Sequence, residues 1–211
     1  MERLICLILG YCFGMIQTSY LYGRLHNIDI RQQGSGNAGA TNALRVLGKK
    51  AGLIVFLGDF LKMIAAAGVV YLLFGKSNAD IIKLLILYTG LGVVLGHTFP
   101  FYLKFKGGKG IAAMAGILVV TDWRITLICF VAFVSVVAIT RYVSLGSLVI
   151  VTIFFFGVLI FGYRGDYGVT GSSLYEMYGV AFLLTALPYY KHRANIVRLI
   201  HGTESKIGSK K

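Results

Sequence analysis

The sequence predicts an all-α, polytopic integral membrane protein, and its composition, its charge pattern and the length of its apolar runs indicate this class. Of 211 residues, 57% are hydrophobic and 14% are charged, whereas soluble domains average about 25% charged residues. The mean hydropathy is +0.77. This composition excludes an ordinary soluble fold, a secreted disulfide scaffold, a coiled coil and a disordered chain. We expect one integral membrane domain over residues 1–211.

Seven apolar runs predict about seven transmembrane helices, at residues 4–23, 51–74, 81–98, 111–120, 125–140, 144–162 and 174–190. A crossing helix needs roughly 17–25 residues. The first run has a long core and no cleavage site, so it is not a signal peptide. The fourth is short, which predicts either a short, tilted helix or a re-entrant segment. The seventh is expected to end at Pro188.

The charges predict the orientation. The net charge is +13, and Lys and Arg collect in cytoplasmic loops of membrane proteins. With the N-terminus outside and the C-terminus cytoplasmic, fifteen Lys and Arg residues lie inside, Lys210 and Lys211 among them, and five lie outside. A re-entrant fourth segment would carry the basic tail outside, so the count favours a crossing. This rule explains the basic balance without a nucleic-acid partner.

A glycine-rich polar segment at residues 31–45 lies on the predicted inside face. Glycines permit close approach of backbone N–H groups to an anion, as in phosphate-cradling nests. Small polar side chains add further hydrogen-bonding groups, and the candidate ligand-binding residues are Ser35, Asn37, Thr41, Asn42 and Arg45. The alternative is a flexible linker, which is also rich in Gly and Ser.

A second inside segment, residues 96–110, ends in a glycine-rich turn that opens the short fourth helix. Such a turn offers unpaired N–H groups and the positive end of the helix dipole to an anion. The candidate residues are Lys104, Lys106, Gly107, Gly108, Lys109 and Gly110. The segment lacks the Walker pattern, so nucleotide hydrolysis is not implied. A lysine cluster that only sets orientation would explain the charges but not the glycines.

Three further sets of polar residues are candidates. In the tail, His192 and Asn195 share a helix face if the last helix continues past Pro188; the alternative is an amphipathic end on the membrane surface. Within the second run, Asp59 and Lys62 predict either a structural ion pair or a functional site. A turn on the inside adds Arg141, Ser144 and Ser147. The three cysteines match neither a zinc site nor a redox pair, and no metal is expected.

Taken together, these motifs closely resemble those of the bacterial acyl-phosphate:glycerol-3-phosphate acyltransferases, the PlsY family. The first motif is Ser35-Gly-Asn-Ala-Gly-Ala-Thr-Asn42. The second combines Gly96-His-Thr-Phe-Pro100 with Phe105-Lys-Gly-Gly-Lys-Gly110. The third is His192-Arg-Ala-Asn-Ile-Val-Arg-Leu with Gly202-Thr-Glu204. The resemblance runs from the first helix to the tail, in motif order.

The resemblance implies a seven-helix enzyme of the bacterial inner membrane with its active site facing the cytoplasm. Such an enzyme transfers a fatty acyl group from acyl phosphate to the sn-1 hydroxyl of glycerol 3-phosphate, giving lysophosphatidic acid and phosphate, without a metal or organic cofactor. It implies essential roles for Ser35, Arg45, His192 and Asn195, and a structural role for Glu204. The glycines of the second motif would serve glycerol 3-phosphate, and either Ser144 or Ser147 would contribute.

We expect direct transfer between two bound substrates in a lipid environment, by a monomer. Ser35, Asn37 and the first loop would hold acyl phosphate. Glycerol 3-phosphate would be held by the second loop's glycines with Arg45, Lys104 or Lys109, His192 and Asn195. Either His192 or a substrate phosphate would take the hydroxyl proton. The alternative function is a small anion or phosphoester transporter, which fits poorly with motifs gathered on one face.

Overall fold

The computed structural model describes residues 1–208, and these residues are α-helices, short 3-10 turns and connecting segments. Five helical stretches in this part of the chain are long and apolar enough to cross a membrane, and Ile111–Thr121 is a shorter apolar helix. The all-α membrane fold class is therefore confirmed. Lys210 and Lys211, which the orientation count included, lie outside the described residues. The chain divides into two compact units, residues 1–121 and 122–211, which are described separately.

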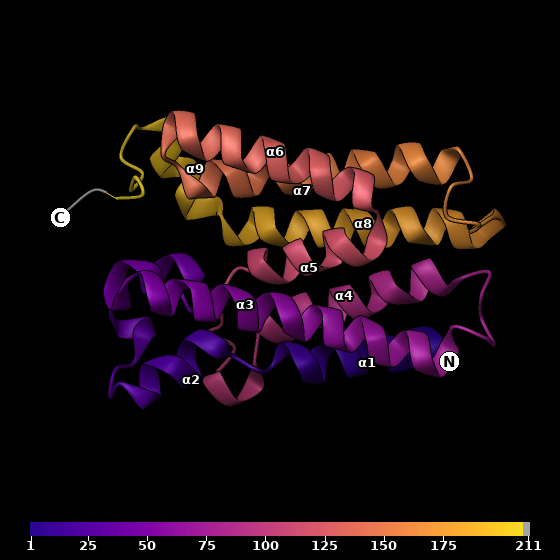
Figure 1. The fold of residues 1–211 in the computed structure, drawn as a ribbon, viewed down its shortest axis with the longest axis horizontal. Helices are drawn as coiled ribbons and strands as arrows, with labels where there is room; N and C mark the ends of the chain where they lie inside the picture. The colour runs from indigo at the N-terminus through magenta and orange to yellow at the C-terminus, as the bar shows by residue number, and fades with distance from the viewer. Residues whose placement is uncertain (209–211) are drawn as a thin grey trace. The chain divides into compact units, whose positions relative to one another are not determined.

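Unit 1 is built around α1 (Glu2–Gly14), α3 (Ala40–Phe74), α4 (Ile82–Thr98) and the short α5 (Ile111–Thr121). Figure 1 shows α1, α3 and α4 lengthwise beside one another, and α1 packs chiefly against α4. Four glycines make that pairing close. A Cβ at Gly10 or Gly14 would strike the backbone of α4, and one at Gly92 or Gly96 would strike the backbone of α1. Small residues four apart allow this approach between membrane helices.

The first predicted helix, 4–23, is broken in the structure. α1 ends at Gly14 and α2 (Thr18–Leu25) begins four residues later, with Gln17 in a non-helical conformation. Carbonyl groups released at the break find partners elsewhere in unit 1. Nζ of Lys62 donates to the carbonyl oxygens of Gly14 and Ile16 at 3.2 and 2.7 Å. The prediction of one continuous helix was wrong because a buried ammonium group replaces the helical hydrogen bonds.

The second predicted helix begins eleven residues before the predicted start, because α3 runs from Ala40 rather than 51. Gly48 interrupts it with φ of +85°. In a straight helix, Leu44 and Gly52 would be about 12 Å apart, yet a Cβ at Gly52 would lie 2.7 Å from Leu44 Cβ. The segment before Gly48 therefore folds back on the membrane helix. Thr41, Asn42 and Arg45, expected in a loop, lie on this folded segment.

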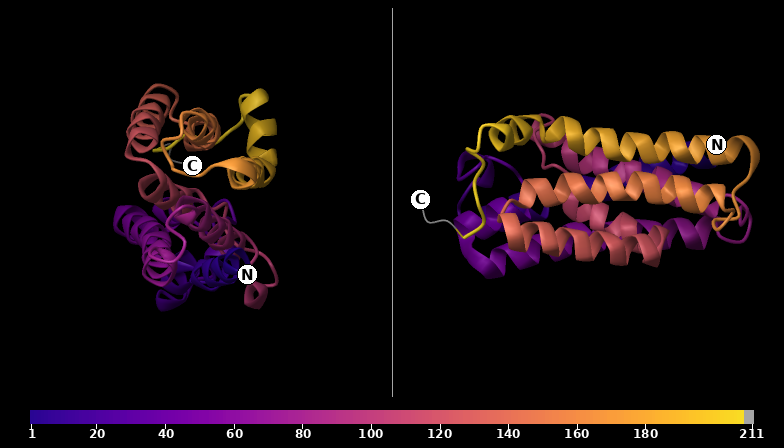
Figure 2. Two further views of the ribbon diagram at one scale, coloured as in Figure 1. Left: turned by 90° about the vertical axis from the view of Figure 1, so that its right-hand side faces the viewer. Right: turned by 90° about the horizontal axis from the view of Figure 1, so that it is seen from above.

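Unit 2 contains α6 (Trp123–Thr140), α7 (Val143–Tyr163), α8 (Gly171–Lys191) and α9 (Arg193–Ile200). Figure 2 shows α7 lying lengthwise beside α6 and α8. Asp122 caps α6 by accepting a hydrogen bond from the backbone N–H of Arg124 at 2.8 Å. α8 continues through Pro188 to Lys191, so the predicted end at Pro188 was wrong. His192 joins α8 to α9 and lies in neither helix.

Candidate functional site

Asn42 holds the first glycine loop together from within. Its Oδ1 accepts a hydrogen bond from the backbone N–H of Ser35 at 2.8 Å, and its Nδ2 donates to the carbonyls of Ile30 and Gln33, both at 3.0 Å. The residue is 1% exposed. All of these bonds are made within the loop and its flanks. The structure thus places Asn42 as a support of the loop, whereas Ser35 is exposed at its surface.

The loop owes its shape to Gly34 and Gly36, whose φ angles are +60° and +70°. A Cβ at Gly34 would strike Oδ1 of Asn42, so glycine is required for the Ser35–Asn42 bond. Asn37 is half-buried beside Gly39. Thr41 is half-buried, and Arg45 is exposed on the folded segment of α3. The first loop therefore presents Ser35 and Arg45 outward from a fixed backbone.

A second support, which the sequence analysis missed, is the pair Asp29 and Arg31. The Arg31 guanidinium donates to both carboxylate oxygens of Asp29, at 3.0 and 2.7 Å. This side-chain hydrogen bonding holds the pKa of Asp29 below its usual value, against the opposing effect of burial. Arg31 also donates to the carbonyl of Leu103 at 3.5 Å. It therefore links the first loop to the second loop.

The second loop has an unusual backbone. Lys104 and Phe105 lie in the left-handed region with φ of +53° and +59°. For residues other than glycine, this backbone conformation costs about 1–3 kcal/mol each. The N–H groups of Gly107 and Gly108 donate to the carbonyls of Thr98 and His97, both at 3.1 Å. Lys104 and Lys106 are exposed, and Lys109 is half-buried. The turn is thus anchored while its cationic side chains lie outward.

The two loops meet at Gly108. A Cβ there would strike both the carbonyl oxygen of Ala38, in the first loop, and Nε2 of His97. A Cβ at Gly107 would strike the carbonyl of His97 and approach that of Thr98 at 2.9 Å. Gly110, with φ of +79°, accepts through its carbonyl from the N–H of Met114 at 2.8 Å and so begins α5. Glycine is therefore required by close packing as well as by conformation.

In unit 2, the candidate residues gather around the carboxylate of Glu204. Oε1 of Glu204 accepts from Asn195 Nδ2 at 2.7 Å and from Ser144 Oγ at 3.0 Å, and Oε2 accepts from Arg198 Nε at 2.7 Å. Burial raises the pKa of Glu204, but the three hydrogen bonds together lower it by more than burial raises it. The pKa of Glu204 therefore lies below its ordinary value. The tail is fixed to α7 and α9 by one buried anion.

The two candidate serines have different partners. The Ser147 hydroxyl donates to the carbonyl of Val143 at 2.8 Å, within its own helix, whereas Ser144 joins the Glu204 cluster. Arg141 ends α6 in the left-handed region with φ of +63°. It is tied to the tail, because its guanidinium donates to the carbonyl of Ile207 at 2.9 and 3.1 Å.

His192 is buried and oriented by its own chain. Its Nδ1 lies 2.8 Å from the carbonyl oxygen of Pro188, and a carbonyl can only accept. Nδ1 therefore carries the hydrogen, and Nε2 of the neutral ring carries the lone pair, a tautomer assigned from this contact. In unit 2 the structure brings Ser144 and Asn195 together through Glu204, while Ser147 is bonded within α7.

Known proteins resemble this chain over nearly all of its length. The profile of the glycerol-3-phosphate acyltransferase family matches residues 4–202. This chain belongs to that family. A glycerol-3-phosphate acyltransferase of Clostridioides difficile (strain 630) is 43% identical over 213 residues, covering 99% of this chain and 97% of the relative. One from Thermoanaerobacter sp. (strain X514) is 39% identical over 211 residues, covering 100% and 98%.

Two solved structures agree with the assignment of this glycerol-3-phosphate acyltransferase. The crystal structure of PlsY (YgiH), an integral membrane glycerol 3-phosphate acyltransferase, in its glycerol 3-phosphate form has a TM-score of 0.84 and 35% identity. The matched region covers 99% of this chain and 96% of the PlsY chain. The lysophosphatidic acid form has a TM-score of 0.79 and 33% identity over the same shares. The predicted family and the multi-pass membrane class are confirmed.

Proposed function

We propose that this acyltransferase uses acyl phosphate as its donor and forms lysophosphatidic acid at the cytoplasmic side of a bacterial inner membrane. Family membership along residues 4–202 supports the acceptor and the reaction. The observation that carries the proposal is the meeting of the two glycine loops at Gly108, because polar and cationic side chains that we propose to bind the two phosphates are carried on these loops within unit 1. Polar and cationic groups held in place before the substrates arrive stabilise phosphate and developing oxyanions, and Ser35, Lys104 and Lys106 are exposed on these loops.

The reaction needs little help with its leaving group, because acyl phosphate is a mixed anhydride. The sn-1 hydroxyl oxygen attacks the acyl carbonyl carbon, the bond from that carbon to the phosphate oxygen breaks, and phosphate leaves with the electron pair. The hydroxyl proton passes to a phosphate oxygen or to Nε2 of His192. Catalysis then consists mainly of positioning and electrostatic stabilisation.

The residues of each unit receive proposed roles. In unit 1, Ser35 and Asn37 with the first loop would bind acyl phosphate, and Arg45, Lys104 and the turn at residues 106–110 would bind glycerol 3-phosphate. Asn42 would act through the loop it supports. In unit 2, His192, Asn195 and Ser144 would serve the reaction, and Glu204 would position the last two. No metal or organic cofactor is required for this chemistry.

The test is turnover by the purified protein in detergent. Acyl phosphate and labelled glycerol 3-phosphate should give labelled lysophosphatidic acid, and acyl-CoA in place of acyl phosphate should give none. If acyl-CoA gives product and acyl phosphate does not, the proposed donor is wrong. If neither donor gives product, the proposed activity is wrong. Direct transfer predicts no acyl group on Ser35 in mass spectra of the enzyme with donor alone. If the rate of His192→Gln depends on pH as the wild-type rate does, a substrate phosphate and not His192 accepts the hydroxyl proton.

A further inference from the structure

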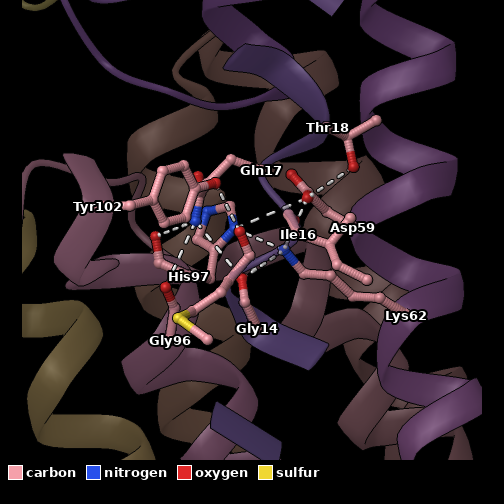
Figure 3. A network of polar contacts seen from close by, with 10 residues as sticks. Gly14, Ile16, Gln17, Thr18, Asp59, Lys62, Gly96, His97 and Tyr102 are labelled. Carbon is pink, nitrogen blue, oxygen red and sulfur yellow. Dashed lines mark hydrogen bonds and ion pairs between the residues drawn. The ribbon is translucent and has the colours of Figure 1, made fainter. Parts of the chain in front are cut away.

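A buried polar network lies behind the second loop, and none of its residues has a role in the proposed reaction. At its centre, Nζ of Lys62 lies 2.9 Å from Oδ1 of Asp59 and 3.0 Å from Nδ1 of His97. Lys62 and His97 are 5% and 3% exposed, and Asp59 is 1% exposed. Figure 3 shows the three side chains converging at the break between α1 and α2.

The network indicates which tautomer of neutral His97 is present. Lys62 and Asp59 are a buried pair of opposite charge, and Lys62 also donates to the carbonyls of Gly14 and Ile16. An ammonium nitrogen has no lone pair, so at this contact Nδ1 of His97 is the acceptor. Nζ has three N–H groups for four neighbouring acceptors, so two of these contacts share one N–H. Nδ1 is 3.6 Å from Oδ1 of Asp59, too far for it to donate there instead. The hydrogen of the neutral imidazole is therefore assigned to Nε2.

His97 touches Gly108 from two sides. Its carbonyl oxygen accepts from the N–H of Gly108 at 3.1 Å and from Nε2 of Gln17 at 2.8 Å. Its ring Nε2 and the carbonyl oxygen of Ala38 both lie so close to Gly108 that a Cβ there would strike each of them. One residue thus contacts the second loop through both backbone and imidazole, at the point where the first loop arrives.

We propose that His97 is a positioning residue that holds the two loops in register through Gly108, and that the Asp59–Lys62 pair holds its ring. This inference rests on the proposed role of the second loop in binding glycerol 3-phosphate. Side chains behind a site commonly orient the groups that touch the ligand. A buried ion pair adds little net stability, so a role in orientation explains why charge is placed here.

Two amides test which ring nitrogen matters. His97→Gln can reach the position of Nε2 beside Gly108, whereas His97→Asn places its oxygen near Nδ1 and keeps only the contact with Lys62. We expect KM for glycerol 3-phosphate to stay near the wild-type value in His97→Gln and to rise about tenfold in His97→Asn, because the loop is displaced. The reverse order, or equal KM values with only the melting temperature lowered, would overturn the proposal.

Thr89→Val is the matched control, since Thr89 is buried on the same helix and its hydroxyl donates to Leu85 within α4. It should leave KM unchanged. A second variant, Asp59→Asn with Lys62→Met, removes both charges together and leaves His97 intact. It should also raise KM, and an unchanged KM there contradicts the proposal even if the His97 variants fail to fold.

The outcome is separable from that of the proposed function. KM for glycerol 3-phosphate can be measured with whichever acyl donor the wild-type enzyme accepts. If no donor supports turnover, the proposed function fails, and hydrogen exchange in residues 104–110 becomes the readout. Faster exchange in His97→Asn than in His97→Gln then supports the positioning role, and equal or reversed exchange refutes it.

Discussion

The backbone N–H of Ser35 donates to Oδ1 of Asn42 at 2.8 Å, across the glycine loop that separates the two residues. Ser35 is the exposed candidate for chemistry, and Asn42 is a buried support. The placement of Ser35, which we propose binds acyl phosphate, thus depends on the buried side-chain amide of Asn42. This relationship makes Asn42 a sharper test of the first loop than Ser35 itself.

Asn42→Ala should lower kcat/KM at least about tenfold, because the loop would lose its three internal hydrogen bonds. Each buried group left without a partner costs about 1–3 kcal/mol, so the melting temperature should also fall. The measurements are steady-state kinetics and a thermal scan in detergent. Asn78→Ala, in the turn after α3, is the control and should change neither, because Asn78 is half-buried and its Oδ1 accepts a hydrogen bond from exposed Ser77. Wild-type kinetics in Asn42→Ala would show that the loop does not need this support.

Gly107→Ala and Gly108→Ala should each raise KM for glycerol 3-phosphate about tenfold or more, because the new methyl group displaces backbone carbonyls or the His97 ring. Gly68→Ala is the matched control, since a Cβ there meets nothing within 4 Å. It should leave KM unchanged and modestly favour the helix. Kinetics with varied acceptor concentration distinguish these results. An unchanged KM in Gly108→Ala would contradict the tight packing of the turn.

Ser144→Ala and Ser147→Ala form a matched pair on one helix. Ser144→Ala should lower kcat/KM about tenfold because it removes one donor from the Glu204 cluster and disturbs Asn195. Ser147→Ala should stay close to wild type, since it loses only a bond to its own helix. A larger loss in Ser147→Ala would reverse the proposed choice of Ser144 over Ser147. Equal losses in the two variants would contradict any choice between the two serines.

The stability of the tail should fall in acid. The pKa of Glu204 is depressed in the folded protein, so the unfolded chain binds its proton first as pH falls. The stabilisation is fully present above the ordinary value of 4.5 and is lost as pH falls from there through the lower folded pKa. Hydrogen exchange of residues 195–208 between pH 6 and pH 3 should show this loosening.

Glu204→Gln supplies the comparison for the acid transition. The amide keeps an acceptor for Ser144 or Asn195 but loses the charge that pairs with Arg198. Exchange in the tail should be faster at pH 6 and should then depend little on pH. An acid transition as large in Glu204→Gln as in the wild type would assign it to another group.

The glycine seam between α1 and α4 should tolerate no larger side chain. Gly10→Leu or Gly92→Leu would place carbon atoms inside the backbone of the facing helix, so we expect little folded protein by size-exclusion chromatography in detergent. Gly179→Leu is the control, because nothing lies within 4 Å of its Cβ position. A normal yield of Gly92→Leu would show that the two helices can separate without loss of the fold.

Much of the fold could be predicted from the sequence, because membrane-crossing helices are set by the length of apolar runs. Each of the seven predicted runs coincides with helical structure, and the run at 111–120 differs from α5 by one residue. The errors fall where side chains compete with the helix. The break after Gly14 depends on Lys62, which lies far along the sequence, and the fold-back at Gly48 depends on packing against Gly52.

The candidate site could be predicted only in part. The motif glycines and polar residues were found because nests and helix termini have local signatures. The supports were missed because they act across distance: His97 contacts Lys62 35 residues away, and Arg31 reaches Leu103 72 residues away. Asn42 was expected to bind substrate. Its supporting position could be seen only from its contacts with the loop backbone in the structure.

The close pairing of α1 with α4 has a consequence for biosynthesis. α1 leaves the ribosome before its chief partner α4, which emerges only after α3 and the following turn have been made. Until then the notches formed by Gly10 and Gly14 face lipid or the insertion machinery. Assembly of residues 1–121 thus waits for the arrival of α4. We expect chains truncated before residue 82, where α4 begins, to leave α1 open to cross-linking by lipid-phase reagents, which completed chains resist.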